Sequence, residues 1–94
     1  MTLAKYIKEQ RLNAALSQKE AVRLLGYKKP QFLSNLERGT SRPPVDVLKR
    51  MCEIYRTSHQ EMREMYIQES IEIAQRKAEG KWELGDSLEA IEFN

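Results

Sequence analysis

Polar side chains from Lys29 to Asn35 have the types and spacing needed for hydrogen bonding to a flat partner. Gln31, Ser34 and Asn35 fall three and four residues apart, so a helix would carry them on one face. An Asn or Gln amide donates and accepts at once, which matches the edge of a base, most naturally adenine. Lys29 adds a positive charge that attracts bases or phosphates. The stretch therefore predicts contacts to nucleic-acid bases.

Two short helices are expected to position these side chains. Ser17 can cap the first helix, with Glu20 completing a capping box, and Gly26 ends it. Pro30 suits the first turn of the second helix, and Gly39 stops that helix. The apolar residues at helical spacing are Ala21, Val22, Leu24 and Leu25 in the first helix and Phe32, Leu33 and Leu36 in the second.

The charge of the chain is divided between its two halves. Residues 1–58 hold 12 Lys and Arg and 5 Asp and Glu, a net charge of +7. Residues 59–94 hold 4 Lys and Arg and 9 Asp and Glu, a net charge of −5, so the total net charge of +2 conceals the asymmetry. A basic front half and an acidic back half indicate a polyanionic partner on one side only, the alternative being two ordinary solvated surfaces.

The two-helix stretch resembles the XRE family, the helix-turn-helix domain of the lambda repressor and Cro type. Ile7 and Arg11 match the first helix of that family. The other matching residues are Ser17-Gln18-Lys19-Glu20, Leu25-Gly26-Tyr27, Gln31-Phe32-Leu33-Ser34-Asn35-Leu36-Glu37-Arg38-Gly39 and Arg42-Pro43-Pro44. The resemblance covers about the first two thirds of the chain and is specific in combination.

The resemblance implies an all-α, five-helix, lambda-repressor-like domain whose third helix, Pro30 to Arg38, enters the DNA major groove. The base contacts expected from it are Gln31, Ser34, Asn35 and Lys29. The backbone contacts expected from it are Gln18, Lys19, Lys28, Arg38 and Arg42. In the family, the arginine of the first helix pairs with the glutamate before the Arg-Gly of the third helix. Here that pair is Arg11 and Glu37, the alternative being two surface charges.

Three further helices complete the expected domain. Thr2 can cap a helix that runs to about Asn13, and a fourth helix is expected from Pro44 to about Arg56. The core positions of the fourth helix are Val45, Leu48, Met51, Cys52 and Tyr55. Ser58, with Glu61 completing a second capping box, opens a fifth helix that is expected to continue to Gly80.

The fifth helix carries apolar stripes on nearly opposite sides. Met62, Met65, Tyr66 and Ile73 form one stripe, and Ile67, Ile71, Ala74 and Ala78 form the other at coiled-coil spacing. We expect the first stripe to dock on the domain. The second is expected to form a homodimer, the alternative being a short seam covered by the chain's own tail.

The last residues, 81–94, are acidic but contain apolar side chains. Trp82, Leu84 and Phe93 favour burial, and Asp86 with Glu89 could cap a last short helix carrying Leu88 and Ile91. We expect an arm that packs on the long helix or on a second subunit, with disorder as the alternative. The expected division is thus a DNA-binding core, 1–58, and a C-terminal dimerisation element, 59–94.

The sequence gives no sign of catalysis or of a cofactor. Cys52 is the only cysteine and cannot form an internal disulfide, which fits a reducing cytoplasm. His59 is the only histidine and has no Cys or Asp cluster around it, so neither a metal site nor a Ser/His/Asp triad is expected. The sequence shows neither a membrane span nor a signal segment.

Together these patterns predict a sequence-specific double-stranded DNA-binding regulator, most simply a cytoplasmic, nucleoid-associated repressor from a bacterium or phage. It is expected to bind a palindromic operator as a homodimer, without a cofactor. Two alternatives remain. One is an antitoxin whose acidic back half neutralises a basic toxin, with DNA binding as autoregulation, and the other is a protein-interaction module that has lost DNA binding.

Overall fold

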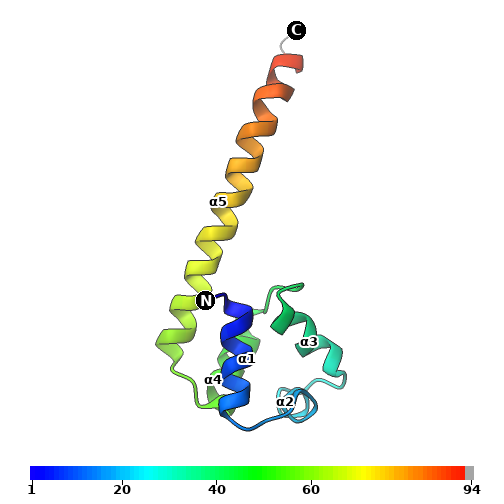
Figure 1. Cartoon of the computed structure of the whole chain (residues 1–94), viewed down its shortest axis with the longest axis vertical. Helices are drawn as coiled ribbons and strands as arrows, with labels where there is room; N and C mark the ends of the chain where they lie inside the picture. The colour runs from blue at the N-terminus through cyan, green and yellow to red at the C-terminus, as the bar shows by residue number, and fades with distance from the viewer. Residues whose placement is uncertain (93–94) are drawn as a thin grey trace.

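The computed structural model describes residues 1–92 of the backbone and the side chains of residues 1–84. This part of the chain is all-α and contains five helices. They are α1 (Leu3–Asn13), α2 (Gln18–Leu24), α3 (Pro30–Arg38), α4 (Val45–Tyr55) and α5 (His59–Glu92). The first four helices and the base of α5 form a bundle, and the rest of α5 projects from it as a single rod (Figure 1).

The ends of the short helices follow the predicted capping chemistry. Ser17 Oγ accepts a hydrogen bond from the Glu20 amide at 3.1 Å, and Glu20 Oε1 accepts one from the Ser17 amide at 3.1 Å. Gly26 and Gly39 have φ values of +89° and +78°, which side chains with a Cβ adopt only at a cost. Gly26 therefore lets the chain turn between α2 and α3, and Gly39 ends α3.

The core lies between α1, α3 and α4 and is closed by the first turns of α5. The contacting pairs include α1 with α3, α4 and α5, and α2 with α3. The largest fully buried side chains are Leu3, Ile7, Val22, Leu25, Leu33, Leu36, Val47 and Met51. Cys52 is buried among them, as predicted, and burial raises the pKa of its thiol. One core therefore holds all four short helices.

Two predicted core positions lie at the surface instead. Leu24 is 57% exposed, because the buried arc of the seven-residue α2 runs through Ala21, Val22 and Leu25 and leaves Leu24 to one side. Val45 is 44% exposed, because it is the first residue of α4 and lies at the rim of the bundle. Val47 takes a core position in α4 that was not expected.

The fifth helix is longer than the sequence predicts. It runs through Gly80 to Glu92, so the expected stop at Gly80 and the separate last helix are wrong. Glycine in a helix interior costs about 1 kcal/mol relative to alanine, which weakens a helix but does not end one unless the chain turns there. No proline follows Gly80 to force such a turn.

The start of α5 is capped by one of the two predicted bonds. Ser58 Oγ accepts from the Glu61 amide at 3.2 Å. The Glu61 carboxylate does not reach back to Ser58, because it accepts from the Tyr6 hydroxyl at 3.1 Å. Burial and this hydrogen bond raise the pKa of Tyr6 to about 12. The bond ties α5 to α1.

Residues 81–92 continue the rod and do not fold back on it. Trp82 is 74% exposed and Leu84 is 66% exposed, so the expected packing of this segment on its own helix is wrong. The side chains of the other tail residues in that prediction, from Asp86 to Phe93, lie outside the described residues. Within the described part of the chain, none of the helices is both long and apolar enough to cross a membrane.

Candidate nucleic-acid interface

Helix α3 separates a buried face from a polar, exposed one. Leu33, Leu36 and Glu37 are buried, whereas Gln31 and Arg38 are exposed and Ser34 and Asn35 are half-buried. Pro30 sits at the first turn, and Lys29 before it is extended, as expected for a residue that precedes proline. The buried stripe therefore fixes which side chains α3 presents to solvent.

The polar side chains on α3 are joined to one another. Gln31 Nε2 donates to Asn35 Oδ1 at 2.8 Å, and Arg38 Nη2 donates to the same oxygen at 2.9 Å. The Asn35 carbonyl accepts from the Thr40 amide at 3.0 Å and from Thr40 Oγ1 at 3.1 Å. In the described chain this network leaves Gln31 Oε1 as an acceptor and Asn35 Nδ2 as a donor toward a ligand.

The turn before α3 is held rigid by aromatic stacking. The rings of Tyr27 and Phe32 lie 4.1 Å apart between centroids at an interplanar angle of 22°. Arg50 of α4 donates from Nη1 to the Leu25 carbonyl at 3.1 Å, which supports the end of α2. Lys28 and Lys29 are exposed on this turn, so both ammonium groups are available to an anionic partner.

Arg11 and Glu37 form a buried ion pair between α1 and α3. Arg11 Nε lies 2.7 Å from Glu37 Oε2, and Arg11 Nη2 lies 3.0 Å from Oε1, a bidentate arrangement. Arg11 Nη1 also donates to the Leu16 carbonyl at 2.7 Å. The hydrogen bonds that Arg11 donates to Glu37 raise the pKa of Arg11, so the guanidinium stays charged.

Two neighbours of this pair were missed from the sequence. Gln18 Nε2 donates to Glu37 Oε1 at 3.0 Å, so the side chain predicted at a DNA phosphate is also part of the ion-pair cluster. The buried hydroxyl of Tyr55 has no hydrogen-bond partner within the described chain. Burial raises the pKa of Tyr55, and the nearby charge of Glu37 raises it further. The sequence alone could not indicate the bond from Gln18 to Glu37, because a Gln at the start of a helix also suits a phosphate contact.

Arg42, predicted at the DNA backbone, lies against α5. Its guanidinium sits 4.6 Å from the centre of the Tyr66 ring, and Nη1 is 3.7 Å from Glu69 Oε1. It also donates to Ser70 Oγ. Glu69 Oε2 in turn accepts from the Leu3 amide at 3.0 Å. The loop after α3 is therefore fastened to α5 and, through Glu69, to the start of α1.

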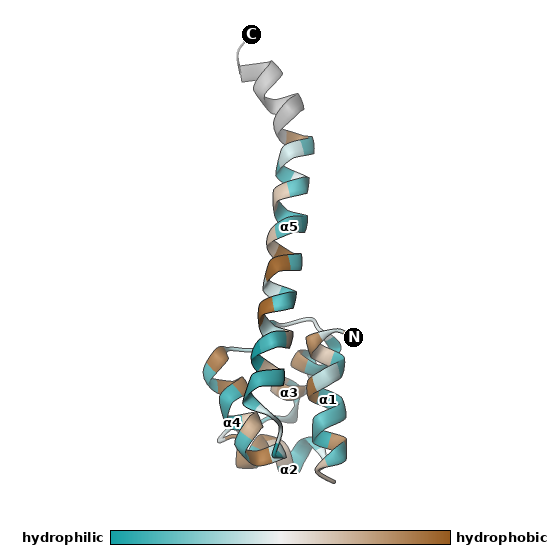
Figure 2. Cartoon of the chain, turned by 90° about the vertical axis from the view of Figure 1, so that its left-hand side faces the viewer, coloured by the Kyte–Doolittle hydropathy of each residue, from teal (hydrophilic) through white to brown (hydrophobic). Residues whose placement is uncertain are grey.

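The two stripes of α5 have different surroundings. Met62 is buried in the core and Met65 and Tyr66 pack against it, as expected, whereas Ile73 is half-buried farther along the helix and is not among the residues packed on the core. The residues of the other stripe, Ile67, Ile71, Ala74 and Ala78, are exposed. Figure 2 shows the hydrophobic bands in the middle of the projecting rod. We refer to the exposed stripe of Ile67, Ile71, Ala74 and Ala78 as the α5 seam.

Within the described residues, no group of three or more His, Cys, Asp or Glu side chains could hold a metal ion.

A helix, a glycine turn and a second helix with an exposed polar face make up a helix-turn-helix, the class of DNA-binding domain to which this arrangement corresponds. The helix-turn-helix domain family matches residues 2–65, and the chain belongs to that family. This is consistent with a regulator of the XRE type. The match ends within the first turns of α5. Comparisons with curated proteins and with solved structures find no match.

Proposed function

We propose that the protein is a sequence-specific transcriptional regulator that reads the DNA major groove with α3 and represses transcription by occupying its operator. The observation that carries this proposal is the network on the exposed face of α3. Gln31 and Asn35 are held in fixed orientations one helical turn apart, with one free acceptor and one free donor. An adenine edge offers the complementary donor and acceptor in the major groove. Ser34 and Lys29 flank this pair and are proposed to contact neighbouring bases.

The phosphate contacts are proposed at the start of α2 and at the turn. The Gln18 backbone N–H lies at the N-terminus of α2, where free amides and the helix dipole favour an anion. Lys19 is exposed beside this position, and Lys28 is exposed on the turn before α3. Arg38 is exposed at the end of α3 and is oriented by Asn35. Arg42 is proposed as a structural residue, because its guanidinium is held by Tyr66, Glu69 and Ser70.

The regulator is proposed to act as a homodimer on a palindromic site. One recognition helix reads only a few base pairs, so specific affinity requires two copies about 34 Å apart along the DNA. The exposed α5 seam offers a self-complementary surface on a part of the chain that α3 does not use. The acidic charge of residues 59–94 favours a position away from the DNA.

The experiment that tests this proposal is binding-site selection from random double-stranded DNA, followed by affinity measurements on the selected site and its single-base variants. Gln31→Ala should weaken binding by about 1–3 kcal/mol and relax the preference at one base position. Gln60→Ala, an exposed change at the base of α5, is the matched control and should bind as the wild type.

Two results would count against the proposal. Selection that enriches no sequence would remove specific recognition, and uniform weakening by Gln31→Ala across all single-base variants would assign Gln31 to positioning alone.

A further inference from the structure

The α5 seam is an apolar face that the described part of the chain leaves uncovered. Ile71 is 54% exposed, and Ile67, Ala74 and Ala78 continue the same face along the rod. The bundle packs on the opposite side of α5, through Met62 and Tyr66. An apolar stripe at coiled-coil spacing on a projecting helix is suited to packing against another helix.

We propose that the seam pairs two copies of α5 antiparallel, with Ile67 opposite Ala78 and Ile71 opposite Ala74 of the second copy. This inference rests on the proposed homodimer and specifies its orientation and register. The register places a large side chain opposite a small one in each of the four seam layers. A parallel pair would instead place isoleucine on isoleucine near the bundle and alanine on alanine farther out, which packs the outer layers loosely.

The charged residues at either end of the seam support the same register. Continuing the coiled-coil spacing brings Glu64 one step before Ile67 and Lys81 one step after Ala78. In the antiparallel register these two face each other, so each end of the interface carries a Glu–Lys pair. In a parallel pair Glu64 would face Glu64 and Lys81 would face Lys81, which is unfavourable in a packed seam.

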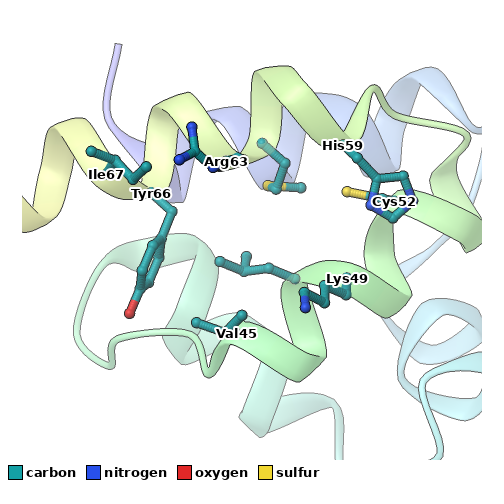
Figure 3. Close-up of a pocket in the computed structure, with 9 residues that line it drawn as sticks. Val45, Lys49, Cys52, His59, Arg63, Tyr66 and Ile67 are labelled. Atoms are coloured by element: carbon teal, nitrogen blue, oxygen red, sulfur yellow. The ribbon is translucent and has the colours of Figure 1, made fainter.

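The register also accounts for the exposed apolar residues at the outer end of the described rod. Leu84 lies on one flank of the seam. In the antiparallel pair, Leu84 of one copy would reach the first turns of α5 of the other copy, on the side that faces α4. There a groove of about 400 Å³ runs between α4 and α5, with Val45, Cys52 and Tyr66 among its lining residues (Figure 3). The partly exposed Val45 and Ile67 lie at its rim.

Trp82 leaves the helix on the other side of the seam. In the antiparallel pair it would reach the opposite flank of the α5 base on the second copy. A shallow hollow of about 600 Å³ lies on that flank, with Tyr6, Met65 and Gln68 in its lining. The indole offers an N–H donor, and Gln68 and Glu61 in the same hollow offer acceptors. The second copy therefore provides for both residues the burial that their own chain does not.

The register also sets how far apart the two bundles lie along the rod. The two-fold axis of this register lies between residues 72 and 73, about ten residues beyond Met62, which anchors α5 in the bundle. At 1.5 Å per residue the two anchors lie about 30 Å apart along the rod.

Disulfide trapping in solution without DNA tests the register. Chains carrying Ile67→Cys and Ala78→Cys are mixed, oxidised and separated without reducing agent. The antiparallel register predicts a cross-link between the two different chains. Two copies of the same variant should not cross-link, because their identical positions would lie about 16 Å apart along the rod, beyond disulfide reach. Wild type, whose only cysteine is the buried Cys52, and Glu72→Cys, on the outer face of the rod, are the controls.

A charge exchange provides an independent measurement by sedimentation. Glu64→Lys and Lys81→Glu should each raise the dissociation constant of the dimer by about tenfold or more, and the double variant should restore it. Circular dichroism of every variant monitors folding. Self-linking of Ile67→Cys, or no rescue in the double variant, would overturn the antiparallel register. Wild type sedimenting as a monomer would overturn the pairing itself, while DNA recognition by α3 is judged separately by site selection.

Discussion

Glu37 is the side chain through which α1, α2 and α3 are joined by hydrogen bonds. Its carboxylate accepts two bonds from Arg11 and one from Gln18, and all three groups come from different helices. Because Glu37 belongs to α3 and directly precedes Arg38, the last residue of the exposed polar face, this buried cluster holds that face in place relative to the rest of the bundle. The cluster is thus structural, but it influences the proposed interface by orienting α3.

Arg11→Met should destabilise the protein by about 3–5 kcal/mol, because it leaves the Glu37 carboxylate buried without its main counter-charge. Arg11→Met combined with Glu37→Leu should recover much of this loss, since two apolar side chains then replace the pair. Urea denaturation followed by circular dichroism measures both variants. A double variant as unstable as the sum of the single ones would show that the two side chains do not act as a pair.

Lys28 and Arg42 should respond differently to salt, although both are cations near α3. Lys28→Ala removes a proposed phosphate contact, so the slope of log affinity against log salt concentration should fall by about one. Arg42→Ala should leave that slope unchanged and lower the thermal midpoint, because the guanidinium is held by Tyr66 and Glu69. A smaller salt slope for Arg42→Ala would show that Arg42 contacts the DNA backbone.

At the scale of the elements, the bounds of the first four helices follow closely from the sequence. Ser17, Gly26, Pro30 and Gly39 act locally through hydrogen bonds and backbone conformation, so their effect can be read from neighbouring residues alone. The buried pair of Arg11 and Glu37, which joins two helices, was expected from the family resemblance.

The features that the sequence did not predict depend on contacts between distant segments or on a missing signal. Arg42 meets Tyr66 and Glu69 across more than twenty residues, and an arginine next to a recognition helix suits DNA equally well. Val45 has the periodicity of a core residue, but its position at the start of α4 exposes it. Gly80 resembles a helix end, yet only its backbone angle distinguishes an end from an interior glycine.

Gly80→Ala tests whether α5 continues past this residue. An added Cβ would meet no atom within 4 Å, and in a helix interior alanine is favoured over glycine by about 1 kcal/mol. The variant should therefore gain helical ellipticity at 222 nm and melt at a higher temperature. Position 80 points away from the seam, so a change in dimerisation would not explain the gain. If Gly80 ended the helix in a left-handed conformation, alanine would lower both quantities instead.

At the scale of the whole molecule, the chain combines a basic helix-turn-helix bundle with a projecting helix of opposite charge. The long dimension of the backbone is 59 Å, against 27 and 19 Å for the other two, and most of that length is α5. The basic residues belong mainly to the bundle and the acidic ones to the rod. Such a division favours DNA at the bundle and a protein partner at the rod, and the seam makes a second copy the simplest partner.

Ile71→Glu should separate assembly from folding. Ile71 lies beside the two-fold axis of the proposed dimer, so the variant would bring one carboxylate into each of the two neighbouring apolar layers at the centre of the seam. The dissociation constant of the dimer should rise by about 100-fold or more. Because Ile71 is 54% exposed in the single chain, the helical content should stay close to that of the wild type. Operator affinity should fall steeply, since two half-sites are then no longer bound by one linked pair.

Arg76→Gln, which also makes the net charge more negative by one but lies on the outer face of the rod, is the matched control and should remain dimeric. Sedimentation velocity measures assembly, and titration on a selected operator measures binding. An Ile71→Glu protein that still sediments as a dimer would place the interface elsewhere on the chain, whereas a monomer that keeps full operator affinity would show that recognition does not need the pair.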